Sequence, residues 1–426
     1  MNFALITLPV LLLAAGTPIF AGLLIAATVA LAFFMNIPLN AVHQNLFGSL
    51  NFSGLLAVPF FIYAGELMSR GTVSQRLVDF VHSFVAGVPG ALGVTTVGTA
   101  TVFGAISGSS AAAVASVGKV MSPSMDAAKY PRRVTAGLVT SVSAIGIVIP
   151  PSIPMIVYGA SAEASIPRLY AAGVLPGLLL AGALVVFVIF RARQAGHGDA
   201  QRVSARGILS ATRRAIWALG APIIVLGGIY GGVFSPTEAA SVACLCAMVV
   251  TRLVFRELSF ADILESARTA VLASAQILVI VAAAGLFSWV LTVNQIPQTL
   301  VGWIAAYEVE PWQFLLAVNI LLLLWGCVME PMSAILLLTP MLVPLVDALE
   351  IDKVHFGVVM TLNLAIGLFT PPFGINIFVA QSVLGMKTTD IYRGVLPYFM
   401  IFLLVLLVVT YVPAISRISA ELLMFG

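Results

Sequence analysis

Charged residues are scarce in this sequence. Only 9% of its 426 residues are Asp, Glu, Lys or Arg, whereas 61% are hydrophobic. Soluble globular domains carry about 25% charged residues, so the composition excludes one. The apolar runs are of helix length and rarely alternate strictly, which excludes an outer-membrane barrel. The composition therefore predicts an all-α polytopic membrane protein.

Cysteine and histidine are also scarce. The three cysteines (Cys244, Cys246 and Cys327) lie in apolar runs without metal-ligand spacing, which favours buried inert thiols. None of the four histidines lies in the middle of a predicted span, and no HExxH motif is present. An intramembrane enzyme would need a histidine or paired aspartates at depth. We therefore expect no enzymatic activity, no cofactor and no nucleic-acid partner.

Two apolar runs each contain a pair of prolines. Residues 143–152 read SAIGIVIPPS and residues 364–373 read LAIGLFTPPF. A proline has no amide hydrogen and its ring clashes with the carbonyl four residues back. Carbonyls without partners are tolerated inside a membrane only where they face protein or a cavity. The runs therefore predict two broken transmembrane helices, and the carbonyls that lose their helical partners are those of Gly146, Ile147, Gly367 and Leu368.

Two longer apolar stretches are interrupted near their middle by small or polar residues. Residues 90–122 contain Ser107-Gly108-Ser109-Ser110, and residues 312–346 contain Met329-Glu330-Pro331-Met332-Ser333. Each arm of the first stretch has about 16 residues, fewer than the roughly 20 that cross a membrane. We predict two re-entrant helical hairpins with their tips at depth. For the first stretch, one long tilted helix with serines on a packed face is the alternative.

The two halves of the chain superpose at one offset. Adding 221 to Pro150 gives Pro371, and the same shift aligns Ser109 with Glu330 and a shared Gly-Val-Leu-Pro motif. We predict a first repeat (1–190) with an amphipathic interfacial helix (73–85), a hairpin (90–122) and a broken helix (134–158). A basic cytoplasmic linker (191–214) leads to a second repeat (215–426) with a hairpin (312–346) and a broken helix (356–384).

Basic residues predict how the halves are oriented. The loop 126–133 contains Lys129, Arg132 and Arg133, whereas the equivalent loop 347–355 contains only Lys353. The first loop should be cytoplasmic and the second outside. The halves then have opposite topology, which is typical of inverted-repeat secondary transporters.

Each hairpin tip is expected to form a sodium site with one of the helix breaks. Sodium is a hard cation that prefers oxygen ligands, and tips and broken helices supply carbonyls and hydroxyls near the membrane midplane. The alternative is a purely structural role, in which the prolines only kink a helix and the serines only allow close packing. The predicted sodium ligands are Ser107, Gly108, Ser109, Ser110, Gly146, Ile147, Pro150, Ser152, Glu330, Ser333, Gly367, Leu368, Thr370 and Pro371.

An anionic substrate is expected between the two tips, where helix amino ends favour a carboxylate. No Arg or Lys lies at the predicted midplane. Of the carboxylates within predicted spans, Glu66 and Glu238 lie near span ends, so Glu330 is the strongest functional candidate. The predicted substrate-binding residues are Ser109, Ser110, Pro151, Glu330, Pro331, Pro372 and Asn376.

Four runs of sequence resemble one transporter family: PFFIYAGELM (59–68), FGAISGSSAAAVASVGKVM (103–121), AIGIVIPPSIPMIVYG (144–159) and LNLAIGLFTPPFGIN (362–376). They are similar to the large, DctM-like permease subunit of tripartite ATP-independent periplasmic (TRAP) transporters. The resemblance implies sodium-coupled import of a small organic acid, such as a C4-dicarboxylate or sialic acid, across a bacterial inner membrane.

The resemblance also implies two protein partners, a small four-helix membrane subunit (DctQ-like) and a periplasmic substrate-binding protein (DctP-like), besides the lipid bilayer. The implied fold is that of elevator-type transporters, with arm helices at 73–85 and 256–268 and a moving unit of hairpins and broken helices. A self-sufficient sodium/dicarboxylate symporter is the alternative. Such symporters usually have Ser-Asn-Thr tips, which this sequence lacks.

Overall fold

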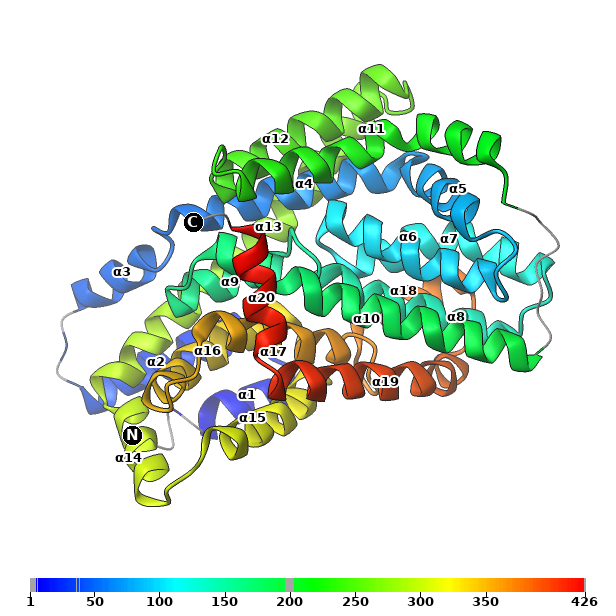
Figure 1. Ribbon diagram of the computed structural model, residues 1–426. Helices are drawn as coiled ribbons and strands as arrows, with labels where there is room; N and C mark the ends of the chain where they lie inside the picture. The colour runs from blue at the N-terminus through cyan, green and yellow to red at the C-terminus, as the bar shows by residue number, and fades with distance from the viewer. Residues whose placement is uncertain (1–4, 6, 36, 38, 196–202, 425–426) are drawn as a thin grey trace.

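The computed structural model describes every residue except 1–4, 6, 36, 38, 196–202 and 425–426 (Figure 1). The described residues form helices and connecting segments, and none is in a strand. This agrees with the predicted all-α polytopic fold. Six helices are long and apolar enough to cross a membrane, or seven if the bent pair 40–48 and 53–70 is one span.

The first half of the chain contains two short helices at one edge, an amphipathic helix and a hairpin followed by a broken helix. Its elements are α1 (Leu8–Ala14), α2 (Ile19–Phe34), α3 (Leu39–Gly48), η2 (Ser53–Leu56), α4 (Ala57–Arg70), α5 (Val73–Val85), α6 (Ala91–Ser107), α7 (Ser110–Ala127), α8 (Arg132–Val142), η3 (Ser143–Ile147), α9 (Ile153–Ala162) and α10 (Ile166–Ala195).

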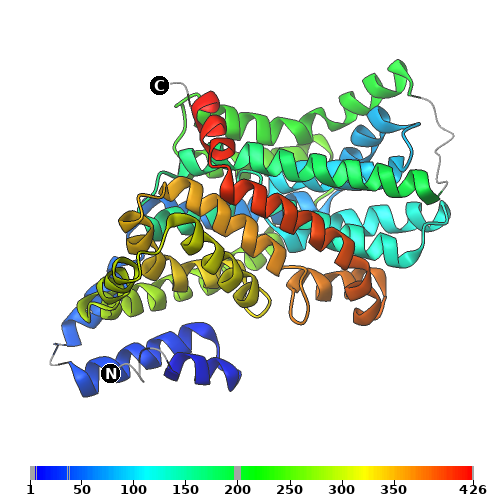
Figure 2. The same cartoon turned by 60° about the horizontal axis from the view of Figure 1, so that its bottom comes forward.

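The second half has a similar order of elements with longer helices at its start. They are α11 (Ala205–Tyr230), α12 (Pro236–Val249), η4 (Val250–Val254), α13 (Phe260–Val293), α14 (Ile296–Ala306), α15 (Pro311–Gly326), α16 (Pro331–Ala348), α17 (Lys353–Gly367), α18 (Ile375–Leu384), α19 (Thr388–Tyr411) and α20 (Ala414–Leu423). Helices α1 and α2 lie at the opposite end of the molecule from the α6–α7 hairpin, and α10 and α19 run side by side (Figure 2).

The predicted hairpins are present as pairs of helices. Helix α6 ends at Gly108, which adopts a left-handed conformation with φ of 59°. Ser109 then caps α7, because its side-chain oxygen accepts the Ala112 N–H at 3.4 Å. Only glycine adopts this conformation without a steric penalty, so one continuous helix over residues 90–122 is excluded. Glu330 caps α16 in the second hairpin in the same way.

Both proline pairs interrupt their helices as predicted. The first break separates η3 from α9, and the second separates α17 from α18. The peptide bonds Pro150–Pro151 and Pro371–Pro372 are both cis.

The helix starts keep the offset seen in the sequence. Helix α7 begins at Ser110 and α16 at Pro331, so 331 − 110 = 221. Helix α8 begins at Arg132 and α17 at Lys353, so 353 − 132 = 221. The repeat therefore extends from residue types to secondary structure, while the opposite orientation of the halves stays a prediction.

The prediction of a separate arm helix at 256–268 is wrong. Ser259 and Asp262 form a capping box that starts α13 at Phe260, and this helix continues without interruption to Val293. A capping box satisfies two otherwise unpaired N–H groups and so fixes a helix start. A helix is present where the first arm was predicted, because α5 spans Val73–Val85, and its role as an arm stays a prediction.

Helices also extend into the predicted linker. Helix α10 continues to Ala195 and α11 begins at Ala205, so both ends of 191–214 are helical. Its middle, 196–202, lies outside the described residues. Helices α3 and α20 were not expected from the sequence.

Candidate functional site

The first hairpin tip lies against the first helix break. A Cβ atom built on Gly108 would lie 2.9 Å from the carbonyl oxygen of Pro151, and one built on Gly146 would lie 3.9 Å from the carbonyl oxygen of Ser109. Behind the tip, a Cβ atom on Gly104 would lie 2.3 Å from the Cα atom of Gly146. Two glycines therefore allow the backbones of α6 and η3 to touch.

Ser152 occupies the gap that the first proline pair creates. Its hydroxyl donates a hydrogen bond to the Ile147 carbonyl at 2.5 Å, and its oxygen accepts the Met155 N–H at 3.4 Å at the start of α9. The Ile147 carbonyl loses its helical partner as expected but gains this one. Tyr170 adds a hydrogen bond at 3.5 Å from its hydroxyl to the Ser152 carbonyl.

The second break satisfies its carbonyls with backbone groups. The Leu368 carbonyl accepts the Asn376 N–H at 2.9 Å, and the Gly367 carbonyl accepts the Thr370 N–H at 3.2 Å. The Thr370 hydroxyl donates to the Ile366 carbonyl at 2.6 Å. A carbonyl oxygen has two lone pairs, so the Gly367 and Leu368 oxygens keep the capacity to accept a second partner.

Asn376 joins the second break to the first hairpin tip. Its side-chain amide donates to the Ser110 hydroxyl at 2.7 Å and to the Thr140 carbonyl at 3.0 Å. Asn376 and Ser110 are both buried. The first residue of α7 and the second residue of α18 thus meet, although the sequence separates them by 266 residues.

The second hairpin contacts the second break through glycines. A Cβ atom on Gly367 would lie 2.4 Å from the carbonyl oxygen of Gly326, which ends α15. Glu330 is half-buried, and a carboxylate oxygen accepts the N–H and the hydroxyl of Ser333, both at 3.4 Å. Pro331 is buried beside it. Among the described residues, the hydrogen bonds of the Glu330 carboxylate therefore stay within the start of its own helix.

The remaining candidate carboxylates lie elsewhere. Glu238 is the third residue of a capping box with Ser235 at the start of α12, which is a structural role. Glu66 approaches Arg70 at 3.9 Å one turn later in α4.

The sequence analysis missed Gly65 as a site residue. A Cβ atom on Gly65 in α4 would lie 3.0 Å from the carbonyl oxygen of Ser107, so α4 touches the first tip. Its signal was present in the PFFIYAGELM run, which has a glycine inside a helix. Tyr392 was also missed, and its hydroxyl donates to the Pro372 carbonyl at 2.9 Å.

Helix α5, which packs on α6, is fixed by Glu257 from the segment before α13. The carboxylate accepts the Thr72 N–H at 2.7 Å and a hydrogen bond from the Thr72 hydroxyl, and pairs with Arg76 at 3.1 Å. Burial by itself raises the pKa of Glu257, but the hydrogen bonds from Thr72 and Arg76 outweigh burial and lower this pKa. The Arg76 guanidinium also stacks 3.9 Å from the Phe255 ring centroid.

Oxygen atoms are the available cation ligands at the two tips. Within the described part of the chain, no group of three or more His, Cys, Asp or Glu side chains could hold a metal ion. Carbonyls, hydroxyls and the single Glu330 carboxylate supply the polar atoms there, which suits a hard monovalent cation.

Comparison with known proteins places the chain in a family. Residues 6–415 match the model of the tripartite ATP-independent periplasmic transporter, DctM component. The C4-dicarboxylate TRAP transporter large permease protein DctM of Pseudomonas aeruginosa is 43% identical over 85% of each chain. The isethionate TRAP transporter permease protein DctMQ of Oleidesulfovibrio alaskensis is 39% identical over 96% of this chain and 65% of its own length.

A solved structure has the same fold. The YdaH transporter of Alcanivorax borkumensis, described as having an unusual topology, matches with a TM-score of 0.68 and 15% identity over 96% of this chain and 98% of its own. The family model and the relatives agree over nearly the whole length. The chain therefore belongs to the family of DctM components, the large permease subunits of TRAP transporters.

Proposed function

We propose that this chain is the transmembrane subunit that imports a small organic acid into the cell. The sodium gradient supplies the energy for this import. The observation that carries the proposal is the apposition of each hairpin with a broken helix, which occurs twice at an offset of 221 residues (331 − 110). Secondary transporters with inverted repeats place substrate and ion sites at such breaks.

The first sodium site is assigned to the tip of α6–α7 and the break after η3. The Ser109 and Gly146 backbones approach there, since a Cβ atom on Gly146 would lie 3.9 Å from the Ser109 carbonyl oxygen. The Ser107 and Ser110 hydroxyls are buried at the same tip. The carbonyls of Gly146 and Ile147 complete an oxygen-rich set that suits sodium.

The second sodium site is assigned to the tip of α15–α16 and the break after α17. Its ligands would come from the carbonyls of Gly367 and Leu368, the Thr370 hydroxyl and the tip residues Glu330 and Ser333. The contact between Gly326 and Gly367 holds the hairpin against this break.

The substrate carboxylate is assigned to the region of Ser110 and Asn376. Helices α7 and α18 both begin there, so their amino ends supply N–H groups and positive dipole ends. The hydrogen bond between the two side chains keeps these ends together. Relatives named for C4-dicarboxylate and isethionate transport support a small organic anion as substrate.

An elevator mechanism is supported by the contacts that join the hairpins to the breaks. The pairs Gly104–Gly146, Gly326–Gly367 and Ser110–Asn376 link both hairpins and both broken helices. A unit connected in this way can move as one body against α4, α11 and α12. In this account the Gly65–Ser107 contact belongs to one position of the moving unit.

Two protein partners are part of the proposal. One is a small membrane subunit, because the matching family is one component of a tripartite transporter. A periplasmic binding protein would deliver the substrate, as the family description implies. The assembly would lie in the bacterial inner membrane.

Uptake by reconstituted vesicles tests the proposal. Vesicles that hold the full chain and its small partner should accumulate a labelled dicarboxylate only with sodium outside and binding protein added. Uptake that ran equally well without binding protein would favour the self-sufficient symporter. Uptake that did not depend on sodium would contradict the proposal that transport is coupled to sodium.

A further inference from the structure

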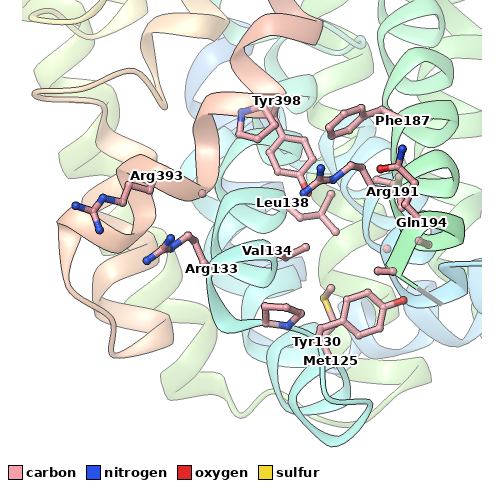
Figure 3. Close-up of a pocket in the computed structure, with 17 residues that line it drawn as sticks. Met125, Tyr130, Arg133, Val134, Leu138, Phe187, Arg191, Gln194, Arg393 and Tyr398 are labelled. Carbon is pink, nitrogen blue, oxygen red and sulfur yellow. The ribbon is translucent and has the colours of Figure 1, made fainter. Parts of the chain in front are cut away.

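A cavity of about 350 Å³ lies between the ends of α8, α10 and α19 (Figure 3). None of the residues that line it is among those proposed for the transport sites. Lys129 lies in the loop before α8 and Arg132 is the first residue of α8, and basic residues predict that this end of the molecule is cytoplasmic.

The inner part of the cavity is apolar. Leu138 of α8 and Val188 of α10 are buried in its wall, and Val188 packs against Gly93 of α6, where a Cβ atom would lie 2.6 Å from its Cγ1 atom. Phe187 and Tyr398 close one end in an edge-to-face arrangement with ring centroids 5.6 Å apart. Such a surface fits hydrocarbon better than a hydrated solute.

Three arginines are among the residues that line the cavity. Figure 3 shows Arg191 between α10 and α8, near Tyr398, whereas the side chains of Arg133 and Arg393 lie on the other side of α8 and point away from Arg191. Asp390 pairs with Arg133 at 3.5 Å. Among the described residues, no ion pair involves Arg191 or Arg393, so the mouth has an excess of positive charge.

The cavity opens beside surfaces that suit lipid. On α10, Val186 and Phe190 are 68% and 57% exposed, and on α19, Leu396 and Met400 are 62% and 57% exposed. Large apolar side chains exposed on both flanking helices are expected where hydrocarbon surrounds the protein. The cytoplasmic leaflet in turn carries anionic lipids that basic pockets attract.

We propose that this cavity binds one anionic glycerophospholipid of the cytoplasmic leaflet. The headgroup phosphate pairs with Arg191, and an acyl chain lies along Leu138 and Val188. Arg133 and Arg393 increase the local positive potential without being required for the direct contact. The apolar interior favours a lipid over a soluble phosphate, because a free anion would have to lose its hydration beside hydrocarbon.

Native mass spectrometry of the purified full chain tests this proposal. The protein in detergent is titrated separately with dioleoyl phosphatidylglycerol, dioleoyl phosphatidylcholine and inorganic phosphate. The anionic lipid should bind more tightly than the zwitterionic one. Arg191→Gln should weaken phosphatidylglycerol binding about fivefold, as expected for one arginine near an anionic headgroup. Arg193→Gln is the matched control, because Arg193 lies on the same helix, is exposed and does not line the cavity.

A second variant tests the acyl chain. Val134 lines the cavity and is half-buried, so Val134→Phe should fill space and weaken binding of both lipids. Equal losses in Arg191→Gln and Arg193→Gln would overturn the proposal in favour of general surface charge. So would unchanged lipid binding in Val134→Phe, or full displacement of phosphatidylglycerol by inorganic phosphate.

Discussion

The two helix breaks share a cis proline pair and differ in what surrounds them. Pro150 and Pro151 are buried, and Pro151 faces a small cavity lined by Phe61, Ala221 and other residues of α4, α11 and α12. Pro371 and Pro372 are exposed, and Phe373 is 58% exposed. The equivalent proline pairs are therefore buried in the first half of the chain and exposed in the second half.

This difference fits a moving unit seen in one position. In the proposed elevator mechanism, one part of the moving unit packs against the scaffold while another part is accessible from outside the protein. The Gly65–Ser107 contact holds α4 against the first tip, whereas at the second break the Pro372 carbonyl accepts a hydrogen bond from Tyr392 of α19. We therefore expect the first half to respond to changes in packing and the second half to tolerate them.

The largest effect is expected from a matched glycine pair. Gly104→Ala places a methyl group 2.3 Å from the Cα atom of Gly146, whereas Gly326→Ala places it 3.3 Å from the Cα atom of Gly367. The first change should destabilise the protein by about 3 kcal/mol through overpacking, and the second by less than about 1 kcal/mol. Thermal unfolding of the purified variants measures both losses of stability. Equal decreases in Tm would contradict the expected difference in packing between the two halves.

A second pair of variants compares the breaks themselves. One double variant combines Pro150→Ala with Pro151→Ala, and the other combines Pro371→Ala with Pro372→Ala. Each should restore helical hydrogen bonds, so that the freed carbonyls no longer bind an ion. Each double variant should weaken the sodium dependence of uptake about tenfold. The first should also lower stability, because its prolines are packed. Unchanged sodium dependence in both would indicate that the breaks are only kinks.

The link between the halves gives a smaller effect. Asn376→Leu removes the bonds to Ser110 and to the Thr140 carbonyl, and Ser110→Ala removes one of them. A double-mutant cycle on substrate KM should give a coupling energy of about 1 kcal/mol. Additive effects would show that the two helix amino ends act independently. Thr361→Val, at a buried residue that bonds within α17, is a control for loss of a hydroxyl.

The smallest effect concerns α5 and its contact with Glu257. Glu257→Gln should lower stability by about 1 kcal/mol at neutral pH, and Glu265→Gln, an exposed control paired with Arg268 at 3.7 Å, should not. Since the Glu257 pKa is lowered in the folded state, its contribution is present above the unfolded pKa of about 4.3 and is lost as pH falls through the folded value. Urea unfolding at several pH values measures this, and a pH-independent difference would contradict it.

Local features of the fold follow from the sequence, because they depend on neighbouring residues. A proline pair removes N–H groups wherever it occurs, and Gly108 permits the left-handed turn that ends α6. The bounds of α5 follow from its amphipathic pattern. The continuous α13 was missed because the basic pattern at 256–268 was read without the Ser259 capping box.

Long-range features of the site did not follow from the sequence. The contact between Asn376 and Ser110 depends on how α18 packs on α7, and no local pattern encodes it. The sequence did indicate that Ile147 and Leu368 lose helical partners, but the replacement bonds depend on the path of the chain after each break. The Ser152 hydroxyl fills this role at one break and the Asn376 N–H at the other.

Equilibrium binding of radioactive sodium to the purified full chain tests the central claim most directly. We expect at least two ions per chain, with one lost when Pro150 and Pro151 are replaced by alanine and one lost when Pro371 and Pro372 are replaced. A folded wild-type protein that binds no sodium, or a stoichiometry unchanged in both double variants, would contradict the assignment of one ion to each pair of hairpin and broken helix.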